Sequence, residues 1–331
     1  MKQTKMFLVL LIASIGSFGQ DTADRYSYFS KKADSLYKAK DYKSAAFTYS
    51  KAFESLGWKG SQVHRYNAAG AWALAGFADS AFFQLDNIAT KSNYLNYAQI
   101  TSDPALISLH QDKRWKPLLE IIKQNKEKAD KAEAKLNKPL IAQLDSILKE
   151  DQNYRMQIDT IIKRYGWESP QMKANMALLN KADSINLIKV KKILDEYGWL
   201  GPDVIGGTGN ITLFLVIQHA DQATQEKYLP MMREAAKNGK APPGNLALLE
   251  DRVALGQGKR QIYGSQIGLD KETNSYYILP LEDPDNVDRR RASVDLEPLA
   301  QYVKRWQIQW DVEQYKKDLP SLESKVKGGR K

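Results

Sequence analysis

The feature that most constrains the fold of this chain is a ladder of small and large apolar residues at helical spacing. Between Tyr26 and Trp58 it comprises Phe29, Ala33, Leu36, Tyr42, Ala45, Tyr49 and Ala52. Small residues let two helices approach closely, and large residues fill the space between them. Asp41 and Tyr42 stand where the two halves of the ladder meet, so the pattern predicts a helix-turn-helix unit.

A second ladder follows the first and indicates that the unit is repeated. Its members are Tyr66, Gly70, Ala73, Gly76, Ala81, Leu85 and Ile88. Both ladders resemble the tetratricopeptide repeat, a helix-turn-helix unit of about 34 residues. A third, degenerate stretch around Pro104 and Trp115 resembles the helices that cap such arrays. The resemblance covers residues 20–122 and implies a concave surface that binds a peptide segment of another protein. Two repeats and a cap could instead serve only as a scaffold, and the sequence leaves both alternatives open.

The first nineteen residues are typical of a secretory signal peptide. Lys2 and Lys5 precede an apolar run from Met6 to Ile15, and Ser17-Phe18-Gly19 fits a cleavage site. The alternative is an uncleaved anchor, but this run is shorter than the about 20 residues that a bilayer requires. We therefore expect residues 1–19 to be removed, the protein to be exported to the periplasm or the exterior, and no transmembrane segment to remain.

The absence of cysteine limits the chemistry further. A chain without this residue has no disulfide, thiolate metal ligand, cysteine nucleophile or lipoprotein anchor. The formal net charge is +10, but the lysines alternate with acidic residues, as on ordinary solvated helix faces. Nucleic-acid binding calls for clustered charge, so no nucleic-acid partner is expected. Residues 123–138 form one such charged stretch and predict a helical spacer.

Helical periodicity continues beyond Asn137, where we place the start of a second domain at residues 139–315. Leu140 to Tyr165 and Ala182 to Tyr197 have apolar helical faces. Alternating β-forming residues at Gln261 to Gln266 and Ser275 to Leu281 predict one hairpin, turned at Asp270 to Asn274. The expected fold is mainly α: a helix-turn-helix repeat domain, then a mostly helical domain with one small β-hairpin. Residues 316–331 read as a basic, disordered tail.

A glycine-rich stretch from Ile205 to Asn210 leads into an apolar helix that is expected to start at Ile211. Such a loop can hold a phosphate with its backbone N–H groups. It lacks the Lys-Ser/Thr of a P-loop, and no strand-rich unit surrounds it. We therefore predict no nucleotide and no other cofactor.

A second resemblance lies in the C-terminal half, from about Leu140 to Tyr302. The residues that carry it are Asp151-Gln152, Arg155, Asp183, Asn186, Tyr197-Gly198-Trp199, Gly206, Gln218-His219-Ala220-Asp221, Asp251-Arg252, Gln261, Tyr263-Gly264-Ser265-Gln266, Asp283-Pro284, Asp288 and Arg290-Arg291. They resemble an uncharacterised bacterial family, domain of unknown function 6624. Leu200, Ser265 and Asp295 depart from its pattern without removing a functional group. The resemblance implies a shared site and supplies no activity.

Two classes of function fit these residues. In the first, an exported binding protein of the cell envelope holds a protein with its repeat and a small anionic or polar ligand with its second domain. The candidate ligand-binding residues are Gln218, Asp221, Arg252, Gln261, Tyr263, Gln266, Asp283, Arg290, Arg291, Asp151 and Arg155. The alternative is a hydrolase or transferase in which His219 acts as general base, oriented by Asp251. An arginine, Arg252 or Arg290, would then hold an anionic group.

Several observations limit the catalytic reading. The serine nucleophile motif Gly-x-Ser-x-Gly does not occur, so acyl transfer lacks its usual signature. Only three histidines exist and none has metal-ligand spacing, so no metal site is predicted. His219 could also be a core histidine in a buried network with Asp251, because buried polar groups need partners whether or not they react.

Overall fold

The structure, a computed structural model, describes residues 17–270, 273 and 275–328. Residues 1–16 of the expected signal peptide lie outside this range. Contacts divide the chain into two compact units, with the division between Lys135 and Leu136. Helices dominate both units, and the described residues contain one two-stranded sheet, which confirms the mainly α prediction. None of the described helices has the length and apolar character needed to cross a membrane.

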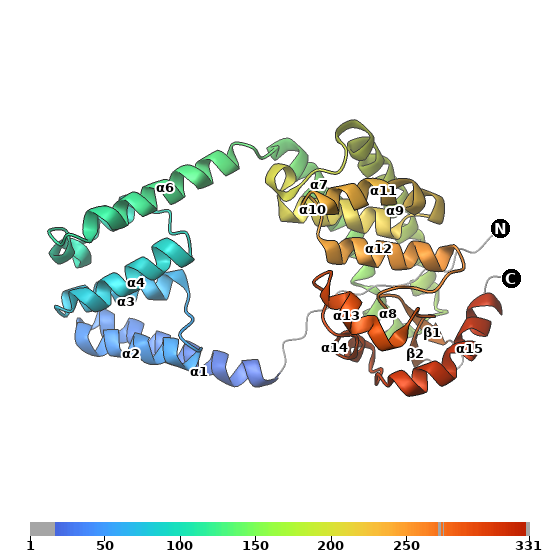
Figure 1. Ribbon diagram of the computed structural model, residues 1–331, viewed down its shortest axis with the longest axis horizontal. Coiled ribbons are helices and arrows are strands. Elements are labelled where there is room, and N and C mark those ends of the chain that lie inside the picture. The colour runs from blue at the N-terminus through green and yellow to red at the C-terminus, as the bar shows by residue number, and fades with distance from the viewer. Residues whose placement is uncertain (1–16, 271–272, 274, 329–331) are drawn as a thin grey trace. The chain divides into compact units, whose positions relative to one another are not determined.

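The N-terminal unit is a stack of helices in which the first four each pack on the next and the last long helix packs on the fourth (Figure 1). Its elements are α1 (Ser17–Lys38), α2 (Tyr42–Ser55), α3 (Gln62–Leu74), α4 (Ala78–Lys91), α5 (Tyr97–Ser102), the 3-10 helix η1 (Pro104–Leu109) and α6 (Trp115–Glu133). Asp41 and Ser61 cap α2 and α3 by accepting hydrogen bonds from the backbone N–H groups of Ser44 and His64. These caps place the turns between successive helices.

The apolar ladder forms the interior of this unit. Ala33, Ala45, Tyr49 and Ala52 are fully buried, and most of them belong to one hydrophobic cluster that extends to Ile122 on α6. The predicted spacer at residues 123–138 continues α6 to Glu133, and a new helix begins at Lys138 after its cap Asn137. Small buried residues therefore account for the close packing of α1 to α4.

The C-terminal unit begins with six helices, and all but the second contribute to its largest core. They are α7 (Lys138–Arg155), α8 (Ile158–Tyr165), α9 (Pro170–Tyr197), α10 (Pro202–His219), α11 (Gln222–Lys237) and α12 (Pro243–Gly256). Leu144 on α7, Leu194 on α9 and Leu213 on α10 are buried in one cluster, and α10 packs on α7, α9, α11 and α12. The C-terminal ends of α7 and α10 carry the polar residues discussed below.

The glycine-rich segment does not form the loop that we expected. It lies inside α10, which is kinked at Gly206, with φ 68° and ψ 167°. This conformation is open to glycine and strained for other residues. Without a side chain at this position, the chain changes direction and resumes helical geometry at once, so the helix begins at Pro202 rather than at Ile211.

The remaining elements surround the predicted hairpin (Figure 1). Strands β1 (Ile267–Asp270) and β2 (Ser275–Ile278) pair antiparallel, with Ile267 opposite Ile278. The hairpin is therefore confirmed, although its first strand begins after Gln266. It is followed by η2 (Pro284–Asn286), α13 (Val287–Ala292), α14 (Leu299–Tyr302), η3 (Val303–Trp306) and α15 (Val312–Gly328).

The C-terminal tail that we expected to be disordered is helical as far as Gly328. Leu319 and Leu322 of α15 are buried in a cluster with Leu281 and Val287. The prediction relied on the many charged residues of this segment and overlooked its apolar positions. These positions are spaced so that they lie on one face of the helix. Residues 329–331 lie outside the described range.

Candidate functional site

A histidine and an aspartate meet where α7 and α10 end. His219 is the last residue of α10, and its Nδ1 lies 3.1 Å from Oδ1 of Asp151 on α7. The Asp151 side chain is 1% exposed and that of His219 is 9% exposed. The buried carboxylate therefore orients an imidazole that retains some contact with solvent.

An arginine one turn further along α7 links this pair to α9. Arg155 Nη1 lies 3.2 Å from Oδ1 of Asp151. Its two terminal nitrogens also donate to the two oxygens of Asp183, at 2.9 and 2.7 Å. Gln152 donates a further hydrogen bond to Oδ2 of Asp151 at 2.7 Å. We call Asp151, Arg155, Asp183 and His219 the His219 site.

The protonation states in the His219 site follow from burial and charge. Burial would raise the pKa of Asp151, but the hydrogen bond and charge of His219, with Arg155, outweigh it and hold that pKa below its usual value. Burial lowers the pKa of His219, the positive charges of Arg155 and Arg252 lower it further, and Asp151 only partly opposes them. At neutral pH the site therefore combines an ionised carboxylate with a neutral imidazole.

These states determine the tautomer of His219. Ionised Asp151 can only accept hydrogen bonds, so Nδ1 of His219 must carry the ring proton. The other ring nitrogen, Nε2, then has a bare lone pair. Among the described residues His219 makes only the side-chain hydrogen bond to Asp151. A group that donates a hydrogen bond, or gives up a proton, can thus be received at Nε2.

Asp251 does not orient His219 as we predicted. Its Oδ1 accepts from the backbone N–H groups of Ile262 and Tyr263, at 2.6 and 2.9 Å, and its Oδ2 accepts from that of Ser265 at 2.9 Å. Asp251 is fully buried, and burial raises its pKa although these three donors oppose the shift. Its place in the fold is to bind the loop between α12 and β1, and Asp151 takes the role that we assigned to it.

Three of the predicted amide residues lie in the same buried region. Gln218 and Gln266 each direct a side-chain N–H group at the carbonyl oxygen of Leu248, at 3.4 and 3.3 Å. Gln261 donates to the carbonyl oxygens of Gln266 and Leu279, and its own oxygen accepts from the Gln266 N–H. Gln261 therefore fastens the hairpin, whereas the Oε1 atoms of Gln218 and Gln266 have no hydrogen-bond partner among the described residues.

The predicted arginines near the C-terminus mostly hold backbone. Arg290 donates to the carbonyl oxygens of Ile262 and Asp283 and forms an ion pair with the Asp283 side chain at 3.2 Å. Arg291 is 1% exposed and donates to the carbonyl oxygens of Glu297 and Tyr263. These contacts, like those of Asp251, lock the segment that follows α12.

Two other candidates are also engaged in local structure. Asp221 caps α11 by accepting a hydrogen bond from the Thr224 N–H at 2.8 Å. Arg252 lies close enough to His219 to lower its pKa, and burial lowers the pKa of Arg252 itself to about 10, so this guanidinium stays charged at neutral pH. Of the predicted residues, Asp151, Arg155, Arg252 and His219 are thus brought together.

One family model matches the part of the chain that contains these residues. The model described as a family of unknown function (DUF6624) matches residues 138–313, which is more than half of the chain. This chain belongs to the DUF6624 family. No curated protein and no solved structure is detectably similar to it. The matched range contains α7 to α14 and all four residues of the His219 site.

Two polar residues of this DUF6624 domain were not among our candidate site residues. Asp183 pairs with Arg155, and Asn186, one turn further along α9, donates a hydrogen bond to the carbonyl oxygen of Ile147 at 3.4 Å. Asn186 is fully buried, and its Oδ1 has no partner among the described residues. Their spacing of one helical turn within the family pattern was the available signal.

The residues of the domain offer no ready metal centre. Within the described part of the chain, no three His, Cys, Asp or Glu residues are placed to hold a metal ion. In the His219 site, the carboxylate groups are already bound to Arg155 and His219. The site is therefore suited to hydrogen bonding and proton transfer by its own side chains.

Proposed function

We propose that this protein is an exported binding protein whose DUF6624 domain binds a polar ligand at the His219 site. The observation that supports this proposal is the neutral imidazole of His219, held by ionised Asp151 so that Nε2 is an unused acceptor. A ligand that donates a hydrogen bond to Nε2 would use this free acceptor.

Charge in the site favours a neutral ligand with donor groups. The guanidinium of Arg155 is already balanced by the carboxylates of Asp151 and Asp183. The buried atoms of the domain without a hydrogen-bond partner among the described residues include the amide oxygens of Gln218 and Asn186, which are acceptors. A hydroxyl- or amine-bearing compound such as a sugar or a cell-wall fragment offers the donor that Nε2 of His219 can receive.

A thermal-shift screen of the purified chain tests the binding proposal. The probes are peptidoglycan fragments, simple sugars and nucleotides, and we expect a saturable rise in melting temperature with a hydroxyl-rich probe. His219→Ala should abolish this shift, and Asp151→Asn should weaken it by misplacing the ring. His64→Ala, in the N-terminal unit, is the matched control and should leave it intact. A shift that survives His219→Ala unchanged contradicts the proposal.

The same geometry supports a second candidate function, general-base catalysis in a hydrolase or transferase. A neutral imidazole backed by a carboxylate can take a proton at Nε2 from water or from a hydroxyl group of a substrate. Loss of a general base lowers the rate by about 10² to 10⁴. Incubation of each bound probe with the wild-type chain and with His219→Gln, followed by mass spectrometry, tests this candidate. Unchanged probe after prolonged incubation with wild type argues for binding alone.

For the N-terminal unit we propose binding of a protein partner through its tetratricopeptide-like helices. The support is the stack of helix pairs with small buried residues, together with its pocket, described below. Export is also proposed, on the sequence of residues 1–19. Cell fractionation and N-terminal sequencing of the native protein test export, which requires a mature chain that begins near Gln20 outside the cytoplasm.

A further inference from the structure

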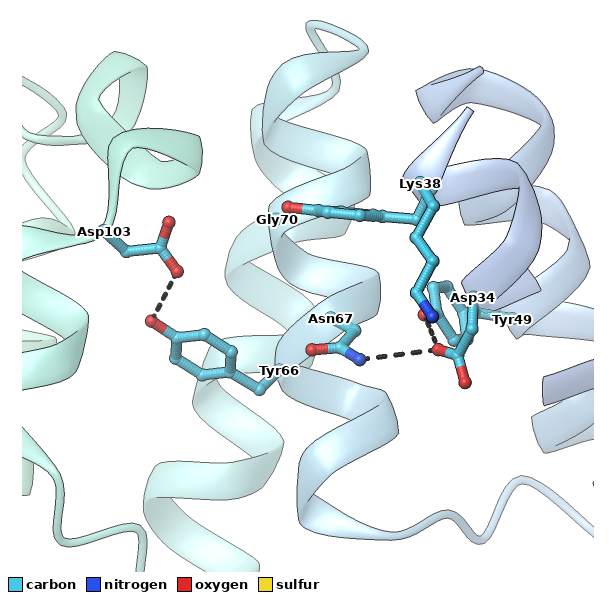
Figure 2. A pocket seen from close by; sticks show the side chains of 8 residues that line it. Asp34, Lys38, Tyr49, Tyr66, Asn67, Gly70 and Asp103 are labelled. Carbon is cyan, nitrogen blue, oxygen red and sulfur yellow. Dashed lines mark hydrogen bonds between the residues drawn. The ribbon is translucent and has the colours of Figure 1, made fainter. Parts of the chain in front are cut away.

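The N-terminal unit contains a polar pocket of about 290 Å³ (Figure 2). It is lined by Asp34, Tyr37 and Lys38 of α1, Tyr49 of α2, Tyr66, Asn67 and Gly70 of α3, and Asp103 just before η1. The volume is at the lower end of the about 300 to 1,000 Å³ typical of ligand pockets. It therefore has room for one side chain or a comparably small group.

Two carboxylates line this pocket, and neutral groups hold them both. Asp34 accepts a short hydrogen bond from the Tyr49 hydroxyl and a longer one from Asn67, at 3.5 Å. His64 Nε2 lies 4.0 Å from its other oxygen. Asp103 accepts from the Tyr66 hydroxyl at 2.9 Å and from the Ala105 N–H at 2.9 Å. Neutral donors fix the positions of the carboxylates but leave their negative charge in the pocket.

The tyrosines respond to that negative charge. Burial, together with the hydrogen bond and charge of Asp34, raises the pKa of Tyr49, and burial with Asp103 does the same for Tyr66. Tyr37, whose pKa burial and Asp103 also raise, adds a third phenol ring. Aromatic faces attract cations through their quadrupole, so rings and carboxylates favour the same kind of guest.

A flexible cation of the protein itself already points into the pocket. Figure 2 shows the ammonium group of Lys38 directed toward Asp34. Lys38 is exposed, and its long side chain can move away at low cost in packing. An alkylammonium group of the protein therefore already lines the pocket, and its flexible chain can yield its place.

We propose that this pocket binds the cationic side chain of a lysine or arginine in a partner protein, which displaces Lys38. The inference rests on the proposed partner-binding role of the N-terminal unit and names the chemistry of the residue bound there. The carboxylates of Asp34 and Asp103 would accept hydrogen bonds from the guest, and the rings of Tyr37 and Tyr66 would face its charge.

Nuclear magnetic resonance of the full chain with ¹³C-labelled tyrosine rings tests the inference. The probes are capped peptides Gly-Ser-X-Ser-Gly, in which X is lysine, arginine, norleucine or glutamate, and n-butylammonium represents a free amine. We expect the lysine and arginine peptides alone to shift the ring signals of Tyr37 and Tyr66 saturably. The double variant Asp34→Asn/Asp103→Asn removes both charges, keeps one acceptor oxygen at each position and should weaken binding by at least about tenfold, because hydrogen bonds to charged groups are lost.

Two further variants sharpen the result. Lys38→Met removes the competing cation and should tighten binding of the lysine peptide. Asp130→Asn changes the same charge on α6 of this unit, where Asp130 pairs with Lys126, and should leave the affinity unchanged.

Each remaining outcome overturns the inference. Equal binding of the norleucine peptide, or undiminished binding in the double variant, would show that charge is not recognised, while a partner-binding role would stand. Absence of binding by every peptide would count against both. Affinity for butylammonium equal to that for the lysine peptide would assign the pocket to free amines. The His219 proposal depends on a separate thermal-shift readout and is unaffected.

Discussion

The two units of this protein bury different kinds of side chain. The interior of the N-terminal unit is mostly apolar and rich in alanine and aromatic residues, with few buried polar side chains such as Arg65 and Gln84, and the carboxylates of Asp34 and Asp103 line a pocket. The C-terminal unit instead encloses charged and amide groups such as Asp151, Asp251 and Arg291 in its interior. The first unit is therefore organised by the sizes of its residues, and the second by specific polar pairings.

This difference predicts where polar substitutions are costly. A lost hydrogen bond beside a water-accessible pocket can be replaced by one to water. A buried donor left without an acceptor instead destabilises the fold by its full desolvation penalty. The same change of an aspartate or a tyrosine should thus have a large effect in the C-terminal unit and a small one in the N-terminal unit. Four substitutions or conditions test this contrast.

The largest effect is expected for Asp251→Ala. It leaves three backbone N–H groups without their acceptor, at about 1 to 3 kcal/mol each, so the free energy of unfolding should fall by at least about 3 kcal/mol. Urea denaturation measures this loss, and hydrogen exchange should locate it between α12 and β1. Asp221→Ala, which removes only a helix cap, is the control and should cost about 1 kcal/mol. Equal losses in both variants would contradict the role of Asp251 in holding the segment after α12.

The next effect concerns the kink in α10. Gly206→Ala places a side chain at φ 68° and ψ 167° and should destabilise the C-terminal unit by roughly 1 to 3 kcal/mol. Gly207→Ala is an unusually close control, because its Cβ would meet no atom within 4 Å and the residue has helical geometry. That change should be neutral or slightly stabilising. Melting curves of both variants check the difference, and a reversed order would refute the role of Gly206.

A smaller effect is expected for Tyr66→Phe in the N-terminal unit. The change removes the hydrogen bond to Asp103, but the pocket lets water reach the carboxylate, so the loss should be about 1 kcal/mol. Tyr97→Phe, at an exposed tyrosine of the same unit, serves as control and should change nothing measurable. A loss of unfolding free energy for Tyr66→Phe as large as that for Asp251→Ala would mean that water does not reach Asp103 in the pocket, which contradicts the contrast.

The smallest effect is the pH dependence that His219 introduces. Its pKa in the folded protein lies below the ordinary value of 6.5, so the unfolded chain binds the proton more readily. The contribution of His219 to the free energy of unfolding is therefore complete above pH 6.5. It decreases as the pH drops from there toward the pKa of His219 in the folded protein. The lowered pKa of Asp151 acts separately, below its ordinary value of 3.8. Urea denaturation between about pH 7.5 and 5.5 should show a shallower decline in His219→Gln; an identical decline would disprove the assignment.

Much of the architecture could be predicted from local patterns. Apolar periodicity indicated the helices, and alternation indicated a hairpin, although its first strand was expected at Gln261 to Gln266 and lies at Ile267 to Asp270. The tail and the kinked start of α10 could not be predicted in this way. In the tail, buried leucines are separated by many charged residues, and at Gly206 a single backbone angle decides whether a helix starts or a loop continues.

The composition of the site was easier to predict than its pairings. Asp151, Arg155, Arg252 and His219 were all among the candidates, but Asp251 was named as the partner of the imidazole. Both aspartates are buried in the same unit, and Asp151 is 68 residues from His219 in sequence. The packing of α7 on α10 decides which carboxylate contacts the ring. This packing cannot be predicted from the types of the residues alone.

The kink at Gly206 also sets how accurately the imidazole can be aimed. The helical segment from Gly207 to His219 is roughly 20 Å long, at 1.5 Å per residue. A change of about 10° at its origin would therefore swing the far end by about 3.5 Å, more than the 3.1 Å that separates His219 from Asp151. Gly206, although far along the helix from His219, thus acts as the pivot that sets where the imidazole meets Asp151.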